Sequence, residues 1–448
     1  MTEEESRNYT EILRAELVPA MGCTEPIAIA YAAAKAVQAL GTQPEHLEVT
    51  CSGNIIKNVK GVTVPNSGGL KGIEAAAVLG AVGGDAGKGL EVIAGATDEA
   101  RRKTGKMLED GVCVVNLAEN VPNLYICCEA FRSGHRSLVE IVDNHTNITR
   151  ILRDGRPWTD PDRIKREDTR PADHAGAAPG TGKKTDGEEP DYSRMTLRGI
   201  INYANMVDIA EVSDILEEQV RCNTAISQEG IDNRWGVRVG KTILENWGRD
   251  VKSLACARAA AGSDARMSGC PMPVIINSGS GNQGITVTMP VVTYAEQWYL
   301  SKEKMYRCLC VSNLVSIYIK HYIGSLSAFC GAVSAACGAG AAITYMAGGS
   351  YEEIGGTITN TLGNVGGIVC DGAKPSCAAK IASSVHAALM AHYMSMSAKE
   401  FQGGEGFIRS DVEDTIKNMG YIGKIGMKET DKEILNVMID KVDVDSSL

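Results

Sequence analysis

Apolar and polar residues follow two different periods in the first third of the chain. Apolar residues recur at three- and four-residue spacing in some segments, which predicts helices, and alternate with polar residues in others, which predicts strands. Because short turns separate the strands, we expect a mixed α+β domain with several antiparallel strands. The predicted helices cover residues 24–40, 70–82 and 97–111. The predicted strands cover residues 46–52, 112–118, 123–131 and 136–143.

Helical spacing dominates from residue 194 onward, with clear examples at 196–220 and 303–323. The exception is residues 272–292, "MPVIINSGSGNQGITVTMPVV", where a short apolar run breaks into a glycine-rich stretch. We therefore predict a mostly α-helical C-terminal domain with one inserted ligand loop. The fold class of the whole chain is predicted to be α+β.

The composition changes sharply between Arg153 and Tyr192. Five of the fourteen prolines and many charged residues fall in this segment, with few large apolar residues. Such a segment cannot bury enough apolar surface to offset the entropy lost on ordering. We expect an α+β domain at 1–152, a flexible linker or insertion at 153–192, and a helical catalytic domain at 193–448.

A long segment without formal charge lies between Lys320 and Glu352. It consists mostly of Ala, Gly, Ser and Cys, whereas a membrane-spanning helix needs about 20 strongly apolar residues. We therefore expect a buried helix and no membrane segment. The net charge of −10 and the absence of a Lys/Arg block argue against a nucleic-acid partner. The acidic, polar start predicts no signal peptide, so we expect a cytoplasmic protein.

Fourteen cysteines occur without a CxxC motif, and most of them are expected to be small core residues. The segment "CDGAKPSC" differs, because Pro375 predicts the first turn of a helix that begins near Cys377. A helix N-terminus favours a thiolate, and Cys370 precedes it on a glycine-rich loop. With Cys330 or Cys337 from "CGAVSAAC", these thiols form either a three-cysteine site or ordinary core packing.

A second candidate is Cys23 in "MGCTEPIAIA". Pro26, with Thr24 or Glu25 as the cap, predicts a helix that starts directly after this cysteine. That position lowers the pKa of a thiol and is typical of a reactive cysteine. The alternative is a capping sequence in which the small residue is incidental.

Three glycine- and asparagine-rich stretches are candidate ligand loops: Cys51–Asn58, Pro65–Gly69 and Asn277–Gly284. Glycine lets backbone N–H groups approach an anion, and Asn and Ser add directed hydrogen bonds. A carboxylate or phosphate would suit them, although such strings also form ordinary turns. Their spacing differs from that of phosphate-binding and dinucleotide-binding motifs.

Four motifs in order, "MGCTEPIAIA", "SGSGNQGI", "CDGAKPSCAAK" and "GMKETDKEIL", resemble the iron–sulfur L-cysteine desulfidase family. That family is related to the α-chain of iron–sulfur L-serine dehydratases and is similar to aconitase in its chemistry. The resemblance implies a 4Fe-4S cluster held by Cys330, Cys370 and Cys377, with one iron left open for substrate. Cys337 is a rival for Cys330. The family's reactive N-terminal cysteine corresponds to Cys23.

The implied activity is elimination of sulfide from L-cysteine, which gives pyruvate and ammonia. The alternatives are L-serine dehydration with the same cluster and a non-catalytic amino-acid-binding protein. A zinc hydrolase lacks suitable His or Asp ligand spacing. A small amino-acid substrate is the expected partner, and we expect a homo-oligomer. The residues expected to bind the substrate are Asn54, Lys57, Asn58, Asn66, Ser67, Ser278, Ser280 and Asn282.

Overall fold

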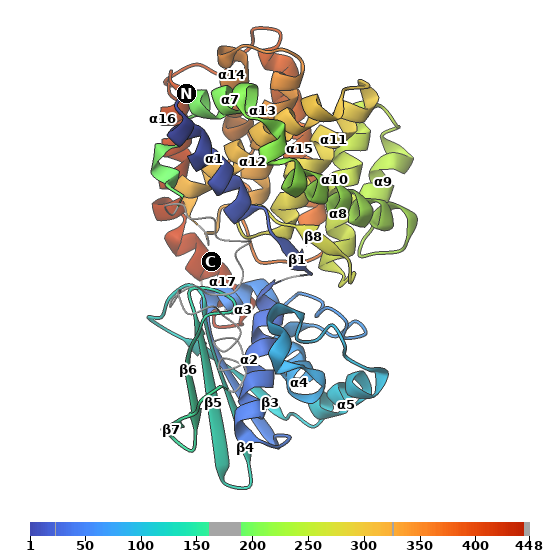
Figure 1. The fold of residues 1–448 in the computed structure, drawn as a ribbon, viewed down its shortest axis with the longest axis vertical. Helices are drawn as coiled ribbons and strands as arrows, with labels where there is room; N and C mark the ends of the chain where they lie inside the picture. The colour runs from blue at the N-terminus through green and yellow to red at the C-terminus, as the bar shows by residue number, and fades with distance from the viewer. Residues whose placement is uncertain (23, 161–189, 325–326, 443–448) are drawn as a thin grey trace.

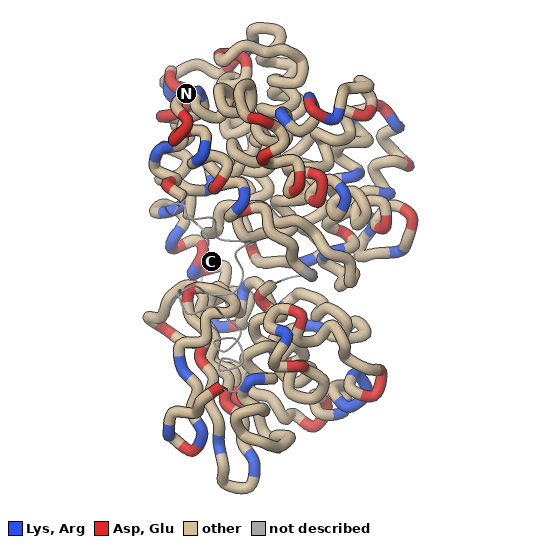
Figure 2. The backbone as a smooth tube through the Cα atoms, viewed as in Figure 1, with Lys and Arg blue, Asp and Glu red and all other residues tan. Residues whose placement is uncertain are grey.

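The computed structural model describes residues 1–22, 24–160, 190–324 and 327–442. Figure 1 shows a large helical body above a smaller part in which helices lie beside a sheet. Each part has its own cluster of buried apolar residues, one built mainly from the C-terminal helices and one from the sheet and its helices. Figure 2 shows acidic and basic positions interspersed over both parts.

The smaller part contains a six-stranded sheet in the order β3-β2-β4-β5-β6-β7. Strands β2 and β3 are parallel and every other neighbouring pair is antiparallel. Alternate residues of β2 are buried, so one face of the sheet packs on the helices. The strands are β2 (His46–Ser52), β3 (Cys113–Ala118), β4 (Tyr125–Arg132), β5 (His135–Val142), β6 (Ile148–Arg153) and β7 (Arg156–Pro157).

Helix α2 lies at the centre of this part, between the sheet and helix α4. Its alanine-rich sequence permits very close packing: a Cβ at Gly80 of α4 would lie 2.2 Å from the carbonyl oxygen of Ala30. Small residues therefore bring the two helix backbones almost into contact. The helices of this part are α2 (Thr24–Leu40), α3 (Gly53–Val59), α4 (Gly72–Gly83) and α5 (Asp98–Glu109).

The helical body is arranged around α13, which packs against α11, α12, α14 and α15. Every described residue of α13 after its first is buried, which explains its uncharged sequence. Among the described residues, no helix has the length and apolar character needed to cross a bilayer. The helices are α7 (Leu197–Met206), α8 (Ser213–Asp232), α9 (Val239–Asn246), α10 (Val251–Met267), α11 (Gly281–Gln297), α12 (Lys302–Ile323), α13 (Gly331–Met346), α14 (Tyr351–Val365), α15 (Cys377–Ser395), α16 (Val412–Tyr421) and α17 (Lys428–Met438).

Each end of the chain packs on the part of the molecule to which its sequence neighbours do not belong (Figure 1). Helix α1 (Glu3–Glu16) packs on the helical body, and β1 (Pro19–Met21) pairs antiparallel with β8 (Pro273–Ile275). Conversely, α17 at the C-terminal end packs on α3 of the smaller part. The predicted division into 1–152 and 193–448 does not anticipate that each end of the chain packs on the other part. The division stays a prediction.

The α+β class predicted from the sequence is confirmed. One difference is that the expected ligand loop at 272–292 is mostly helix, because α11 begins at Gly281 and continues through Pro290. The hydroxyls of Thr286, Thr288 and Thr293 donate to carbonyls one turn earlier, so this β-branched sequence satisfies its polar groups within the helix. A second difference is α3, which occupies a stretch expected to be a loop. Residues 161–189 of the predicted linker lie outside the described residues.

Candidate active site

A short antiparallel bridge places Cys330 next to Cys370. Phe329 pairs with Val369 across the two segments. The backbone N–H of Cys330 donates to the carbonyl of Ile368 at 3.1 Å, and the N–H of Cys370 donates to the carbonyl of Ala328 at 2.6 Å. Two cysteines forty residues apart in the sequence are thereby held in adjacent backbone positions.

The third cysteine, Cys377, is the first residue of α15 and follows the cysteine loop, residues 370–376. Its Sγ lies 3.7 Å from the carbonyl oxygen of Gly372. Asp371 fastens the loop by ion pairs with Lys374, at 2.5 Å, and with Lys380. Burial alone would raise the pKa of Asp371, but hydrogen bonds from the two lysines hold it below the ordinary value.

Cys330, Cys370 and Cys377 line a single cavity of about 150 Å³, called here the cysteine cavity. Burial and, after it, the neighbouring Cys370 and Cys377 raise the pKa of Cys330 to about 12. Burial also raises the pKa of Cys377, so the helix N-terminus expected to favour its thiolate is outweighed by desolvation. The rival residue Cys337 lies two turns into α13, buried beside Thr361, and does not line this cavity.

The metal-binding side chains of this cavity include three cysteine thiols. Every cysteine that the structure describes is a free thiol. Within the described ranges, no three or more His, Cys, Asp or Glu side chains converge closely enough to hold one metal ion. One ion would require all thiolates within about 2.3 Å of a point. Thiolates are the ligands by which proteins hold iron–sulfur clusters, so the residue types present fit such a group.

Three buried cations also line the cysteine cavity, Lys320 from α12, Arg266 from α10 and Lys57 from α3. Burial lowers the pKa of Lys320 to about 8, against the opposing effect of Cys370 and Cys330. The Arg266 guanidinium donates to the carbonyl of Gly22 at 2.9 Å. The cavity thus combines thiols with positive charge, which stabilises bound anions.

The substrate residues expected from the sequence fall into two groups, and their roles stay predictions. Five of them line the cysteine cavity: Lys57, Asn58, Ser278, Ser280 and Asn282. The other three are engaged elsewhere, because Asn54 donates to Asn123, Asn66 donates to carbonyls of residues 93, 94 and 96, and Ser67 donates to Leu70. Cys23 lies outside the described residues.

A family model described as the serine dehydratase alpha chain matches residues 87–436. This chain belongs to the serine dehydratase alpha chain family. Proteins named UPF0597 from Lachnoclostridium phytofermentans and Finegoldia magna are 50% and 46% identical, each over 97% of this chain and 100% of the relative. One from Desulfitobacterium hafniense is 45% identical over 97% of both chains. The predicted relationship to serine dehydratases is confirmed.

The sequence analysis of this serine dehydratase alpha chain family member missed several residues that line the cysteine cavity. Lys320 and Arg266 stand within helical apolar patterns, where a charged residue is normally solvent-exposed, so spacing gave no signal for them. Gln283 stands inside the glycine-rich motif but follows its turn. Its position at the start of a helix could have drawn attention to it.

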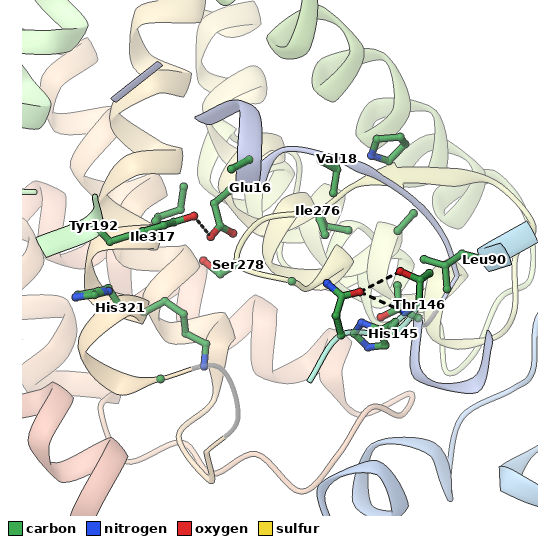
Figure 3. A pocket seen from close by; sticks show the side chains of 18 residues that line it. Glu16, Val18, Leu90, His145, Thr146, Tyr192, Ile276, Ser278, Ile317 and His321 are labelled. Atoms are coloured by element: carbon green, nitrogen blue, oxygen red, sulfur yellow. Dashed lines mark hydrogen bonds between the residues drawn. The ribbon is translucent and has the colours of Figure 1, made fainter. Parts of the chain in front are cut away.

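A larger chamber of about 690 Å³ adjoins the cysteine cavity, and the two share Ser278, Gly279 and Lys320. Figure 3 shows this outer chamber, with Glu16 and Tyr192 on one side and His145 on the other. The Tyr192 hydroxyl donates to Glu16 at 2.8 Å. Burial raises the pKa of Glu16 despite that bond. In this member of the serine dehydratase alpha chain family, the shared residues place the chamber directly beside the cavity that the thiols line.

Proposed function

We propose that this protein is an iron–sulfur-dependent lyase that eliminates sulfide from L-cysteine. The observation that carries the proposal is the convergence of Cys330, Cys370 and Cys377 on one cavity that also contains buried cations. Membership of the serine dehydratase alpha chain family supports a β-elimination of an amino acid. The four sequence motifs described above support L-cysteine as that amino acid.

In this proposal Cys330, Cys370 and Cys377 hold a 4Fe-4S cluster. When bound, such a cluster with one iron free of protein ligands supplies a Lewis acid. The polar residues of the cavity, among them Asn58, Ser278 and Asn282, orient the amino acid. The narrow cavity also limits the access of bulk water to the reacting atoms.

The overall reaction converts L-cysteine and water into pyruvate, ammonia and hydrogen sulfide. The Cα–H and Cβ–S bonds break, the electron pair of the Cα–H bond forms the Cα=Cβ bond, and sulfide leaves with the electron pair of the Cβ–S bond. The resulting aminoacrylate takes up a proton at Cβ and hydrolyses to pyruvate and ammonia. Cys23, as a thiolate, is assigned to removal of the α-proton.

L-serine dehydration is the second candidate, and the family description favours it. The same arrangement would then release hydroxide in place of sulfide. The reactive-type cysteine in "MGCTEP" favours L-cysteine.

The decisive experiment is an anaerobic assay after reconstitution with iron and sulfide. Pyruvate is measured with L-cysteine and with L-serine at equal concentrations, and released sulfide is measured with L-cysteine. We expect pyruvate and sulfide in equal amounts from L-cysteine and little pyruvate from L-serine, with loss of activity in air. Pyruvate only from L-serine would favour the second candidate. A protein that binds no iron and lacks the broad visible absorbance of a cluster would contradict both.

A further inference from the structure

Three buried polar groups in the cysteine cavity have no partner among the described residues. Lys320 is 7% exposed, and its Nζ has neither a hydrogen bond nor a carboxylate. Arg266 is 6% exposed, and its Nε is unpaired although its terminal nitrogens bind Asn282 at 3.3 Å and Gly22 at 2.9 Å. Gln283 is 6% exposed, and its Oε1 accepts no hydrogen bond.

In the part of the chain that the structure describes, the other buried lysines are paired with carboxylates. Lys35, 1% exposed, lies 2.9 Å from Asp160, and Lys57 binds Asp431. A buried charge without a partner is strongly unfavourable, so proteins seldom retain one except for function. Lys320 departs from this pattern, and it lines both the cysteine cavity and the outer chamber.

Two glycines let these groups pack closely against the backbone at the starts of α11 and α13. A Cβ at Gly281 would lie 2.3 Å from Nε of Arg266, and a Cβ at Gly331 would lie 2.7 Å from the amide carbon of Gln283. Neither glycine has a left-handed backbone, so the need for glycine is steric. The first lies in the "SGSGNQG" motif and the second directly follows Cys330.

We infer that Lys320 and Arg266 bind the α-carboxylate of the substrate, and that Gln283 accepts a hydrogen bond from its α-ammonium group. The unpaired groups comprise donors that carry positive charge and one acceptor, which is the complement of a zwitterion. A cavity of about 150 Å³ limits the ligand to a small molecule. This assignment deepens the proposed function, because it specifies how an α-amino acid is held beside the thiols.

The test uses the reconstituted protein under anaerobic conditions and measures binding of three probes by calorimetry. L-alanine has both charged groups but no leaving group, L-alaninamide lacks the carboxylate, and L-lactate lacks the ammonium group. We expect L-alanine to bind at least about tenfold more tightly than either of the others. Equal affinity for L-alanine and L-alaninamide would overturn the assignment, and this comparison needs no variant.

The variant Lys320→Met is expected to weaken L-alanine binding by about 10- to 100-fold and to leave L-alaninamide binding unchanged. Its melting temperature should rise, because an unpaired buried charge is replaced by an apolar chain of similar length. The matched control is Lys35→Met. It should lower the melting temperature, because Asp160 loses its partner, and should leave L-alanine binding unchanged.

A competing role for Lys320 is to balance the negative charge of the thiolates. In that case Lys320→Met would lose iron, while the loaded fraction would bind L-alanine with wild-type affinity, and the assignment would be overturned. The assignment and the proposed function can fail separately. If the wild type releases no sulfide but Lys320→Met binds L-alanine more weakly than the wild type does, only the assignment stands. Sulfide release with an unchanged KM for L-cysteine in Lys320→Met would leave only the function standing.

Discussion

Gly372 of the cysteine loop packs directly against the carbonyl oxygen of Lys57 in the smaller part of the molecule. A Cβ at Gly372 would lie 2.0 Å from that oxygen, and the glycine has φ of +90°. No side chain can be accommodated at that distance, and the left-handed backbone is itself unfavourable for other residues. The cysteine loop, which carries Cys370 and leads directly into Cys377, is therefore held against α3, on the other part of the chain.

Gly372→Ala is expected to destabilise the protein by about 2–4 kcal/mol, since a backbone penalty and a steric clash add. It should also lower the iron content after reconstitution, because relief of the clash moves Cys370 or Cys377. Chemical unfolding and iron analysis measure these effects. The control is Gly367→Ala, where a Cβ meets nothing within 4 Å. Similar losses in both variants would contradict the role of the Lys57 contact.

The ion pair between Lys57 and Asp431 is expected to fasten α17 to the smaller part. The Lys57 side chain is 3% exposed and that of Asp431 is 21% exposed. Asp431→Asn leaves a buried lysine without a carboxylate and should cost about 2–3 kcal/mol of unfolding free energy. The backbone amides of α17 should also exchange hydrogen faster in Asp431→Asn than in the wild type.

Glu429→Gln is the matched control for that change, because it removes a charge from the same helix. Its partner Lys432 lies at 3.7 Å and both side chains are largely exposed. Exposed pairs of this kind contribute about 0–1 kcal/mol. Equal losses of unfolding free energy and equal amide exchange in α17 for the two variants would show that the buried Lys57–Asp431 pair stabilises α17 no more than an exposed pair does.

The elements of the fold could be predicted where local pattern and burial agree. Strand 46–52 coincides with β2, and helix 24–40 coincides with α2, because each has a regular apolar period and a clear boundary signal. The helix at 281–297 could not be predicted, because Gly281, Pro290 and three threonines weaken local helix preference. Burial of nearly the whole helix in the body overrides that preference, and the sequence does not reveal burial.

The candidate site was predictable only where its residues form contiguous motifs. Cys370 and Cys377 share one loop–helix junction, so their proximity follows from local geometry. Cys330 depends on the bridge between Phe329 and Val369, which is a long-range pairing. Lys320 reaches the cavity from α12, and only the packing of α12 against α13 brings it there.

His392 should make stability depend on pH. It is 3% exposed, its Nδ1 lies 2.9 Å from the Thr344 hydroxyl, and burial lowers its pKa from 6.5 to about 4. Between these values the unfolded chain binds more protons than the folded one, so stability falls as the pH falls from 6.5 to 4. The shift corresponds to a loss of up to about 3 kcal/mol.

Unfolding free energies of the wild type and His392→Gln, measured from pH 7 to pH 4, test this effect. The wild type should lose more stability than the variant across that range, since glutamine does not titrate. Parallel curves for the two proteins would show that other groups cause the acid sensitivity. Circular dichroism should confirm that both proteins are folded at pH 7.

Cys330→Ser and Cys337→Ser should separate the two candidates for the third thiolate. Cys330 lines the cavity with Cys370 and Cys377, whereas Cys337 is buried beside Thr361 in α14. We expect Cys330→Ser to lose at least about half of the iron and visible absorbance after reconstitution, because a cluster is held by its thiolates. Cys337→Ser should retain both and lose about 1–2 kcal/mol of stability from a polar group in a tight core. The reverse pattern of iron loss would assign the ligand to Cys337, and equal retention in both variants would contradict a three-cysteine cluster.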